Sequence, residues 1–289
     1  MSTLREIVYN SVIAIHRRTG KEWIPLKEIY KEVDKNRDVG INNGGASVRA
    51  ALETHSALSE AFSGTEEYIL KEKGSGLYKS IYYDQIKFIN NMNIGDVFTR
   101  DQLMAIFKIS GQSGIMKTNS LNCLVLTTSE ENGVYGDSLV ENGFITYTGE
   151  GLTGDQTITK NNKTIYESNE NDLPMYLFSK DNNKKYIFEG QVKLCAEPYQ
   201  VVEKDIDGND RFVWKFPLSI VYPNDYNFKK DEKFSEIVYE ITEIESKVYS
   251  DMIEEQNDLE YREGKINIRK YRKTDKKIQR TKKPDYIAE

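Results

Sequence analysis

Four side chains in the middle of the chain are of the types that can hold a planar heterocycle. Tyr135, Asp137, Tyr147 and Thr148 lie close together in the sequence and stand among glycines. Two tyrosine rings can stack on a flat base, which contributes about 1–3 kcal/mol per base. A carboxylate can accept a hydrogen bond from the exocyclic amine of cytosine, and Gly149 lets the backbone approach a sugar-phosphate closely. Residue types alone leave an ordinary alternative, because tyrosine in strands and glycine in turns are common.

The motifs around these residues make the pattern more specific. In chain order they are Gly-Asp-x-Phe, a serine- and glycine-rich loop, a hydrophobic strand, Tyr-x-Asp, and a strand that ends in Tyr-Thr-Gly-x-Gly: residues 95–98, 110–115, 121–126, 135–137 and 146–151. Together they resemble the SRA (YDG) domain, and most closely the SRA-like domains of bacterial modification-dependent restriction endonucleases. The resemblance spans roughly residues 94–220.

That resemblance implies a curved β-barrel that flips a modified cytosine out of duplex DNA. By motif, Tyr135 and Tyr147 would stack on the base, Asp137 would accept from the cytosine amine, and Thr148 and Gly149 would line the pocket. Extrusion of a base costs a few kcal/mol, which stacking and hydrogen bonds to its edge offset. Contacts to the DNA backbone or grooves are expected from Gln112, Ser113, Lys117, Gly151, Gln156 and Asn162.

The chain departs from the eukaryotic family pattern at two points. The loop after Tyr-Thr-Gly is the short segment 150–156, and one residue rather than two separates Tyr135 from Asp137. The modification that the pocket reads, and its sequence context, therefore stay open.

The elements ahead of these motifs predict three helices and a β-hairpin. Apolar residues recur at helical spacing in 4–18, after Pro25 and in 48–55, and the glycine turn 74–76 separates two strand-like runs. The Asn-Asn-Gly-Gly stretch at 42–45 predicts a turn. This order is typical of a winged helix-turn-helix, whose third helix enters the major groove. Contacts to DNA would come from Arg49, Lys71, Lys73 and Lys79. Because this region is nearly neutral, a protein-docking module is the alternative.

The remaining segments complete a three-part organisation. Residues 83–93 indicate a connecting segment, and short apolar runs from 94 onward predict a β-rich domain. Apolar residues at intervals of three and four predict a long amphipathic helix over about 232–262. We therefore predict an α+β chain with a winged helix-turn-helix at 1–82, an SRA-like curved β-barrel at 94–222, and a long helix with a basic tail at 231–289.

Charge is distributed unevenly at the C-terminal end. Residues 231–263 contain twelve acidic and three basic residues, whereas residues 264–283 contain ten basic residues and one acidic residue. The acidic helix is too negative to lie on DNA, so it is expected to pack on the body or on a partner chain. The basic block would attract phosphates by counterion release, and a solvated linker is the alternative.

Composition excludes several classes of function. No run approaches the roughly 18 apolar residues that a membrane-spanning helix needs, and no signal peptide is apparent. We expect no membrane partner and a cytoplasmic location, which suits two buried free thiols at Cys123 and Cys195. Two cysteines and two histidines argue against a structural zinc site. Without a glycine-rich phosphate loop, no cofactor is expected.

No nuclease centre is predicted in this chain. His16 and His55 lie outside any His-Asn-His pattern, and we expect them to be core or helix-surface residues. Glu263-Gly264-Lys265, with Asp251 or Asp258 upstream, is a short pattern that arises readily by chance when 30% of residues are charged. Pro284 suits the first position of a helix, so the chain resembles one that continues into a nuclease domain or meets a nuclease subunit.

The leading interpretation is a reader of double-stranded DNA with a modified cytosine, in a restriction system that acts against phage. Its partner would be a nuclease domain or subunit, and a homodimer is compatible with the paired sites that restriction systems use. Two alternatives stay open: a complete modification-dependent endonuclease, and a regulatory protein whose winged helix docks partners.

Overall fold

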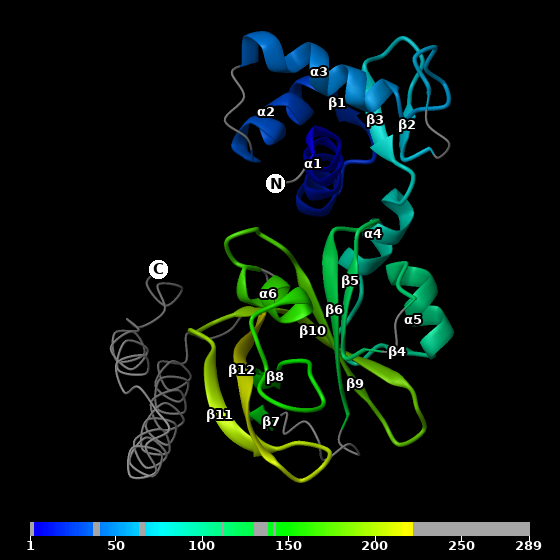
Figure 1. Cartoon of the computed structure of the whole chain (residues 1–289). Helices are drawn as coiled ribbons and strands as arrows, with labels where there is room; N and C mark the ends of the chain where they lie inside the picture. The colour runs from blue at the N-terminus through cyan, green and yellow to red at the C-terminus, as the bar shows by residue number, and fades with distance from the viewer. Residues whose placement is uncertain are drawn as a thin grey trace, which may run out of the picture. The chain divides into compact units, whose positions relative to one another are not determined.

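Figure 1 shows the computed structural model of the chain. The structure describes residues 3–36, 41–63, 67–110, 113–129, 138–140 and 143–221. Two compact units are present. The first contains residues up to 96 with 100–110 and 118–123, and the second contains 97–99, 111–117 and the residues from 124 onward. The predicted C-terminal helix and basic tail lie outside the described residues.

The first unit combines five helices with a small sheet. The helices are α1 (Leu4–Thr19), α2 (Leu26–Asn36), α3 (Ile41–Glu53), α4 (Tyr83–Asn90) and α5 (Arg100–Phe107), and the strands are β1 (Ile24–Pro25), β2 (Ile69–Lys71) and β3 (Leu77–Ser80). The strands pair in the order β1-β3-β2, and both pairings are antiparallel. The first three helices and the β2–β3 hairpin thus follow the predicted order. Their identity as a DNA-binding winged helix stays a prediction.

Local signals set the ends of α1. Thr3 and Glu6 form a capping box, in which the Glu6 N–H donates to Thr3 Oγ1 at 3.2 Å and the Thr3 N–H donates to Glu6 Oε2 at 2.8 Å. Gly20 ends the helix in the left-handed conformation, with φ of 67°. Between these ends Val8 and Val12 are buried in a core shared with α2, α3 and the small sheet.

One local prediction in this unit is wrong, and one predicted connecting segment contains a helix. The stretch 42–45, predicted as a turn, lies within α3, and the segment 83–93, predicted as a connection, contains α4. Val48 and Leu52 of α3 are buried in the core that α1 and α2 share. That packing outweighs the low helix propensity of glycine, about 1 kcal/mol relative to alanine. In α4, Tyr83, Ile86 and Ile89 share a buried side at helical spacing.

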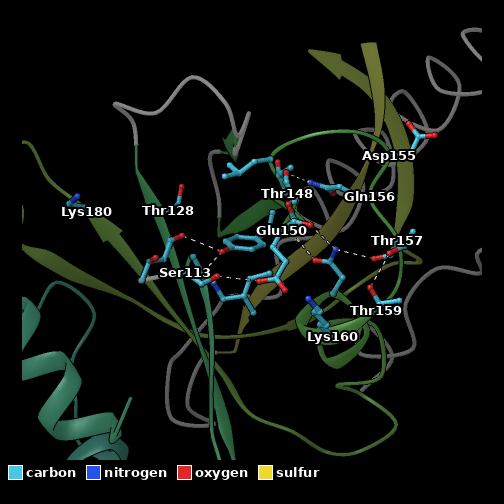
Figure 2. Close-up of a pocket in the computed structure, with 18 of the residues that line it drawn as sticks. Ser113, Thr128, Thr148, Glu150, Asp155, Gln156, Thr157, Thr159, Lys160 and Lys180 are labelled. Carbon is cyan, nitrogen blue, oxygen red and sulfur yellow. Dashed lines mark hydrogen bonds between the residues drawn. The ribbon is translucent and has the colours of Figure 1, made fainter. Parts of the chain in front are cut away.

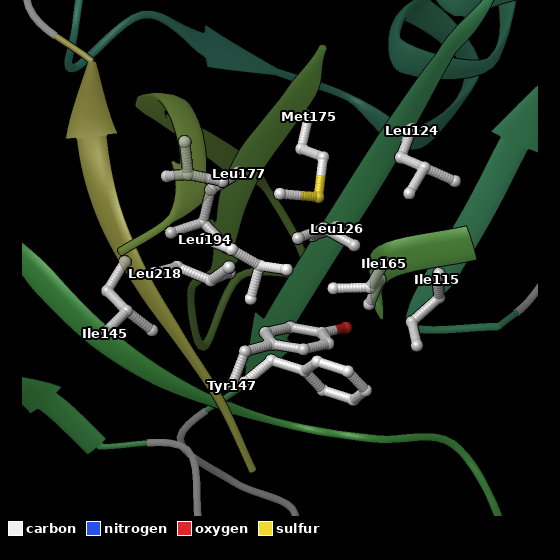
Figure 3. Packing of buried hydrophobic residues seen from close by; sticks show 12 residues of the cluster. Ile115, Leu124, Leu126, Ile145, Tyr147, Ile165, Met175, Leu177, Leu194 and Leu218 are labelled. Atoms are coloured by element: carbon white, nitrogen blue, oxygen red, sulfur yellow. The ribbon is translucent and has the colours of Figure 1, made fainter. Parts of the chain in front are cut away.

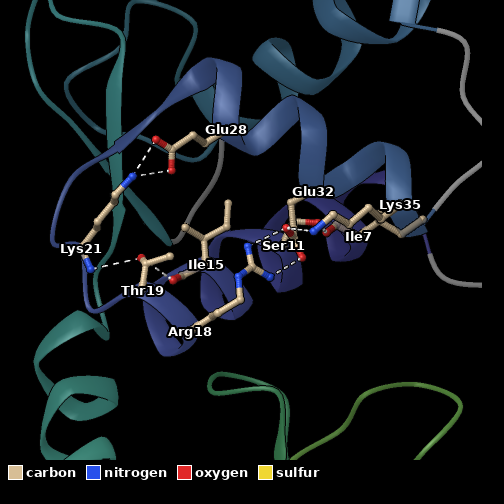
Figure 4. A network of polar contacts seen from close by, with 9 residues as sticks. All are labelled: Ile7, Ser11, Ile15, Arg18, Thr19, Lys21, Glu28, Glu32 and Lys35. Carbon is tan, nitrogen blue, oxygen red and sulfur yellow. Dashed lines mark hydrogen bonds and ion pairs between the residues drawn. The ribbon is translucent and has the colours of Figure 1, made fainter.

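Ion pairs join α1 to α2 (Figure 4). Arg18 donates to both carboxylate oxygens of Glu32, at 3.0 and 2.8 Å, and Lys35 donates to Glu32 Oε2 at 3.0 Å. The hydrogen bond from Arg18 is the main reason why the pKa of Glu32 lies below its usual value. Because Glu32 is only 7% exposed, this bidentate contact satisfies a carboxylate that would otherwise be costly to bury.

His16 is a core residue of the first unit, as predicted. Its Nδ1 lies 2.7 Å from the Lys21 carbonyl oxygen, and its Nε2 accepts a hydrogen bond from the Ser80 N–H at 2.9 Å. These partners require a proton on Nδ1 and none on Nε2, which is a neutral ring. Burial lowers the pKa of His16 and so favours the same state.

The second unit is built on a nine-stranded sheet. Its strands are β4 (Val97–Phe98), β5 (Ile115–Thr118), β6 (Cys123–Ser129), β7 (Ser138–Val140), β8 (Phe144–Thr148), β9 (Met175–Lys180), β10 (Tyr186–Leu194), β11 (Tyr199–Lys204) and β12 (Asp210–Val221). The path runs β5-β6-β9-β10-β12-β8-β7, with β11 on β12 and β4 on β10. β6 and β9 pair in parallel, whereas β9, β10, β12 and β8 pair antiparallel.

The predicted α+β class is confirmed, whereas the predicted curved β-barrel is not closed among the described strands. Among the described strands, β5 and β7 end the path and do not pair with each other, so the sheet is open. Strand alternation in a sequence predicts strands and faces, and it carries no information on whether two distant edges meet.

The core of the second unit lies on the sheet face that α6 (Lys160–Tyr166) covers (Figure 3). Ile165 of α6 is fully buried among side chains of β6, β8, β9, β10 and β12. Tyr147, near the end of β8, belongs to the same cluster. This packing fixes the end of β8 and the start of α6 relative to each other, and both carry site residues.

Two further sequence expectations concern membranes and thiols. Within the described residues, no helix has the length and apolar character needed to cross a bilayer. Cys123 is a buried free thiol, and Cys195 is a partly buried free thiol. Burial raises the pKa of each to about 12, which keeps both as thiols rather than reactive thiolates.

Candidate functional site

A cavity of about 650 Å³ lies in the second unit, at the ends of β5, β6 and β8 (Figure 2). Its wall includes most of the residues that the sequence predicted for the site: Ser113, Tyr147, Thr148, Gly149, Gly151, Gln156 and Asn162. The loop from 149 to 159 forms much of this wall, and the first turn of α6 contributes Lys160 and Asn162. The structure therefore brings the Tyr-Thr-Gly-x-Gly motif and the segment after it around one cavity.

Other predicted site residues are placed elsewhere. Tyr135, Asp137 and Gln112 lie outside the described residues. Lys117 is exposed on β5 and is not among the residues that line the cavity.

Tyr147 joins the cavity wall to the core. Its side chain is only 2% exposed, and its hydroxyl donates to the Gly114 carbonyl oxygen at 2.8 Å, with the Thr127 carbonyl oxygen at 3.2 Å. These contacts hold the start of β5 and the end of β6 at the cavity. The ring is thus part of a packed wall, and its stacking on a base stays a prediction.

Gln156 closes the loop after β8 onto β12. Its Nε2 donates to the Gly149 carbonyl oxygen at 2.6 Å, and its Oε1 accepts from the Trp214 N–H at 2.9 Å. The Gln156 N–H donates to the Phe212 carbonyl oxygen at 2.8 Å. With 5% exposure and both ends of its amide bound within the chain, Gln156 shapes the loop.

Asn162 of α6 also shapes this loop through its side-chain amide. Its Oδ1 accepts from the Glu150 N–H at 2.8 Å, and its Nδ2 donates to the carbonyl oxygens of Glu150 at 3.0 Å and Thr157 at 3.1 Å. The amide thereby bonds both backbone groups of Glu150. Asn162 is 2% exposed. Gln156 in the loop and Asn162 on α6 both line the cavity and bond the backbone of the loop, and their contact with DNA stays a prediction.

Gly149 is required by this arrangement. An added Cβ would lie 2.8 Å from Gln156 Oε1 and 2.9 Å from Asn162 Oδ1, closer than such contacts occur in proteins. The glycine therefore leaves room for the two amides that hold the loop.

Glu150 is a site residue that sequence reasoning did not single out. Its side chain is half-buried and lines the cavity. Oε2 accepts from Ser113 Oγ at 3.2 Å and from Asn161 Nδ2 at 2.9 Å. The signal was available, because Glu150 is the variable position within the Tyr-Thr-Gly-x-Gly motif itself. Lys160 and Lys180 also line the cavity and were not predicted.

A buried cation lies beside Thr148. Lys215 of β12 donates to Thr148 Oγ1 at 2.8 Å and pairs with Glu203 Oε1 at 2.6 Å, and its side chain is 6% exposed. The ammonium therefore has an anionic partner and a hydroxyl acceptor, as a buried charge requires. Arg211 of the same strand is 2% exposed and donates through Nη1 to the Gly151 carbonyl oxygen at 2.5 Å. Lys215 and Arg211 of β12 thus hold the wall residues Thr148 and Gly151 in place.

The basic residues predicted in the first unit are largely paired. Arg49 Nε and Lys71 Nζ each lie 2.9 Å from Glu53 Oε1. Hydrogen bonds from Lys71 and Arg49 lower the pKa of Glu53, so the carboxylate stays charged and competes with phosphates for both cations. Lys79 pairs with Glu22 at 2.7 Å. Lys73 is exposed and makes no ion pair within the described residues.

No candidate metal-binding site is present in the described part of the chain. No three His, Cys, Asp or Glu side chains gather there in a way that could hold a metal ion. The acidic and basic residues considered for a nuclease, at 251–265, lie outside the described residues.

The chain is similar to a known protein family over the region that contains the sequence motifs. Residues 94–237 match the sequence profile of the family described as "ScoMcrA-like, SRA domain". No curated protein sequence matches the chain.

Three similar solved structures have TM-scores below 0.5. The sulfur binding domain and SRA domain of ScoMcrA complexed with phosphorothioated DNA has a TM-score of 0.48 at 14% identity, over 76% of this chain and 85% of that one. The Type IV phosphorothioation-dependent restriction endonuclease ScoMcrA has 0.41 at 17%, over 51% of this chain and 30% of that one. The SUVH5 SRA domain bound to fully hydroxymethylated CG DNA has 0.37 at 22%, over 47% and 93%.

The family match covers every motif of the resemblance, from Gly-Asp-x-Phe to Tyr-Thr-Gly-x-Gly, and continues through β12. The chain carries an SRA domain of the ScoMcrA-like family at residues 94–237.

Proposed function

We propose that this chain binds double-stranded DNA and takes a modified cytosine out of the duplex into the cavity at the end of β8. One observation carries the proposal: the Tyr-Thr-Gly-x-Gly motif of an SRA domain forms the wall of a cavity of about 650 Å³. That volume falls in the range of about 300–1,000 Å³ in which proteins hold ligands. A nucleobase with its sugar fits within it.

The resemblance to SRA domains supplies two of the roles: Tyr135 stacks on the base, and Asp137 accepts from the cytosine amine. Tyr147 and Thr148 form the fixed wall, because the hydroxyl of the first is bonded to Gly114 and that of the second to Lys215. A wall that does not rearrange on binding loses less entropy, so more of the contact energy is available to offset base extrusion.

The wider setting that we propose is restriction of DNA that carries modified cytosine, as in defence against phage. The ScoMcrA-like family supports this setting. A nuclease domain or subunit would then act on the DNA that this chain selects, and a homodimer would allow two sites to be read together.

The first unit is proposed as an auxiliary DNA contact. Lys73 is available for phosphate, and Arg49 and Lys71 become available where phosphate displaces Glu53. These contacts are independent of sequence, so the cavity supplies the preference for the modified base.

A gel-shift titration at fixed salt tests the proposal. It compares one duplex that carries cytosine, 5-methylcytosine or 5-hydroxymethylcytosine, with magnesium present. We expect at least a tenfold preference, about 1.4 kcal/mol, for a modified duplex. Equal affinity for all three would refute the reader. Magnesium-dependent cleavage would instead favour the complete endonuclease.

Pocket variants locate the preference. Asp137→Ala is expected to remove it, and Glu170→Ala is the matched control, because Glu170 is exposed and is not among the cavity residues. A preference that survives Asp137→Ala would place recognition outside the pocket.

A further inference from the structure

The β9–β10 hairpin carries three lysines close to the cavity. Lys180 ends β9, and Lys184 and Lys185 lie in the turn before β10. Lys180 pairs across the hairpin with Tyr186, and both residues line the cavity. Lys184 and Lys185 are exposed and are not among the residues that line it. The hairpin therefore begins at the cavity wall and presents its turn to solvent.

None of these lysines has a carboxylate partner in the described part of the chain. The two acidic side chains of the hairpin are engaged elsewhere. Asp181 accepts a hydrogen bond from the Lys185 N–H at 2.7 Å, and Glu189 accepts one from the Ser179 hydroxyl. Other lysines of the second unit do pair with acids, namely Lys163, Lys204 and Lys215. The hairpin thus concentrates cations that are available to an external anion.

The turn holds its lysines on a defined backbone. The Asp181 N–H donates to the Lys185 carbonyl oxygen at 2.9 Å, and the Lys184 N–H donates to the Asp181 carbonyl oxygen at 3.0 Å. Lys184 has φ of 60°, a left-handed conformation that costs most residues about 1–2 kcal/mol and that glycine or asparagine adopts more readily. A bonded turn loses less entropy on binding than a free loop does.

The chemistry of these groups selects a polyanion. An ammonium donates hydrogen bonds and accepts none, so its ligand must supply acceptors. Each DNA strand carries one negative charge per about 3.4 Å of helix axis, and a β-strand advances about 3.3 Å per residue. Lysines of one hairpin can therefore contact neighbouring phosphates. Such contacts position the duplex and carry no sequence information.

We infer that the β9–β10 hairpin binds the DNA phosphates beside the extruded nucleotide through Lys180, Lys184 and Lys185. The inference rests on the proposed function and adds a surface whose contribution does not depend on the base. Lys180, at the cavity wall, contacts the phosphate nearer the base, and the two turn lysines contact the phosphates that follow. Because modified and unmodified duplexes have the same phosphates, the hairpin sets the affinity for both, and the cavity sets the preference.

The salt dependence of DNA binding tests the hairpin. Neutralising both turn lysines in Lys184→Gln/Lys185→Gln is expected to reduce the log-log salt slope by about 1.8, since each phosphate contact contributes about 0.9. Affinity falls equally for modified and unmodified duplexes, so the preference is kept. Lys184→Arg/Lys185→Arg keeps the charge and is expected to keep the slope. An unchanged slope in the glutamine variant would overturn the inference.

The matched control removes the same charge elsewhere in the second unit. Lys163→Gln/Lys204→Gln neutralises two exposed lysines that pair with Glu167 and Asp210 and that do not line the cavity. We expect this variant to keep the wild-type slope, and thermal unfolding of each chain confirms that it is folded. A slope reduced as much in the control as in the hairpin variant would attribute the effect to net charge and overturn the inference.

Neutral methylphosphonate linkages locate the contact on the DNA. They replace the phosphates on either side of the modified cytosine in one duplex and distant phosphates in a control duplex. The linkages beside the base should weaken binding of wild type more than of Lys184→Gln/Lys185→Gln, because the variant has already lost these contacts. Equal weakening would place the lysines on other phosphates and overturn the inference. A wild-type chain without preference for modified DNA would instead refute the proposed function, whatever the hairpin variants do.

Discussion

Replacing Gly149 with alanine tests whether the loop at the cavity is held as the structure shows. The new Cβ would lie 2.8 Å from Gln156 Oε1 and 2.9 Å from Asn162 Oδ1. Gly149 is not in the left-handed region, so the backbone accepts alanine and only space opposes it. Each amide oxygen that must move also accepts a backbone N–H, from Trp214 or from Glu150.

The cost follows from these contacts. Overpacking costs about 1–3 kcal/mol, and weakening two internal hydrogen bonds adds about 0.5–1.5 kcal/mol for each. We expect Gly149→Ala to destabilise the second unit by roughly 2–6 kcal/mol. Because the loop is part of the cavity wall, the preference for modified DNA should fall as well.

Denaturant unfolding followed by tryptophan fluorescence measures this effect. The chain has two tryptophans, so a Trp23→Phe background leaves Trp214 of β12 as the reporter for the second unit. Gly45→Ala, followed through Trp23 in a Trp214→Phe background, is the matched control in the first unit, because its Cβ would lie 3.5 Å from the Tyr30 ring, an ordinary contact, within α3. There the same change should stabilise by about 0.5–1 kcal/mol. A Gly149→Ala chain as stable as wild type would refute the reasoning.

Three further outcomes are expected. Tyr147→Phe should cost about 1 kcal/mol in denaturant unfolding, since it removes the hydrogen bond to Gly114 and keeps the ring in the core; no loss would mean that the hydroxyl does not hold the wall. Glu53→Gln should release Arg49 and Lys71, and steepen the log-log salt dependence of DNA binding by about 1–2 if the first unit contacts phosphates; an unchanged slope would argue for a docking module. Burial lowers the pKa of His16 below 6.5, so the unfolded chain binds the proton more tightly and stability should fall as pH drops below about 6.5. Urea unfolding of wild type and His16→Gln on either side of that pH should show a weaker dependence in the variant, and equal dependence would exclude His16 as the cause.

The sequence predicted several residues that share one cavity wall, but not the hydrogen bonds that they make within the chain. Tyr147, Thr148 and Gly149 follow each other in one motif, so finding the motif finds the wall. Gln156 and Asn162 are polar residues in and after a loop, and a sequence does not say whether an amide faces a ligand or its own backbone. The structure answers this through the three hydrogen-bond partners of the Asn162 amide.

Long-range pairing hid other features. Arg211, Val213 and Lys215 share one face of β12, and two charges on a face suggest exposure when only the sequence is known. In the structure all three side chains are buried, and the Thr148 and Gly151 oxygens that accept hydrogen bonds from Lys215 and Arg211 lie 67 and 60 residues away in the sequence. The open path of the sheet was unpredictable for the same reason.

Helix prediction in the first unit failed where packing overrode propensity. Asparagine and glycine at 42–45 favour a turn locally, whereas burial of Val48 and Leu52 in the core favours the helix. The prediction of α1 was correct because the spacing of its apolar residues and its capping box favour the same helix.

The most direct test of the central claim asks whether the modified base leaves the duplex. A 2-aminopurine placed beside the modified cytosine is quenched by stacking and brightens when its neighbour is extruded. The account predicts that saturating protein raises the emission of the modified duplex, and that it does so far less for the unmodified duplex or for the Asp137→Ala chain. Tight, selective binding without any rise in emission would contradict the account, because the base would then be read while still stacked in the helix.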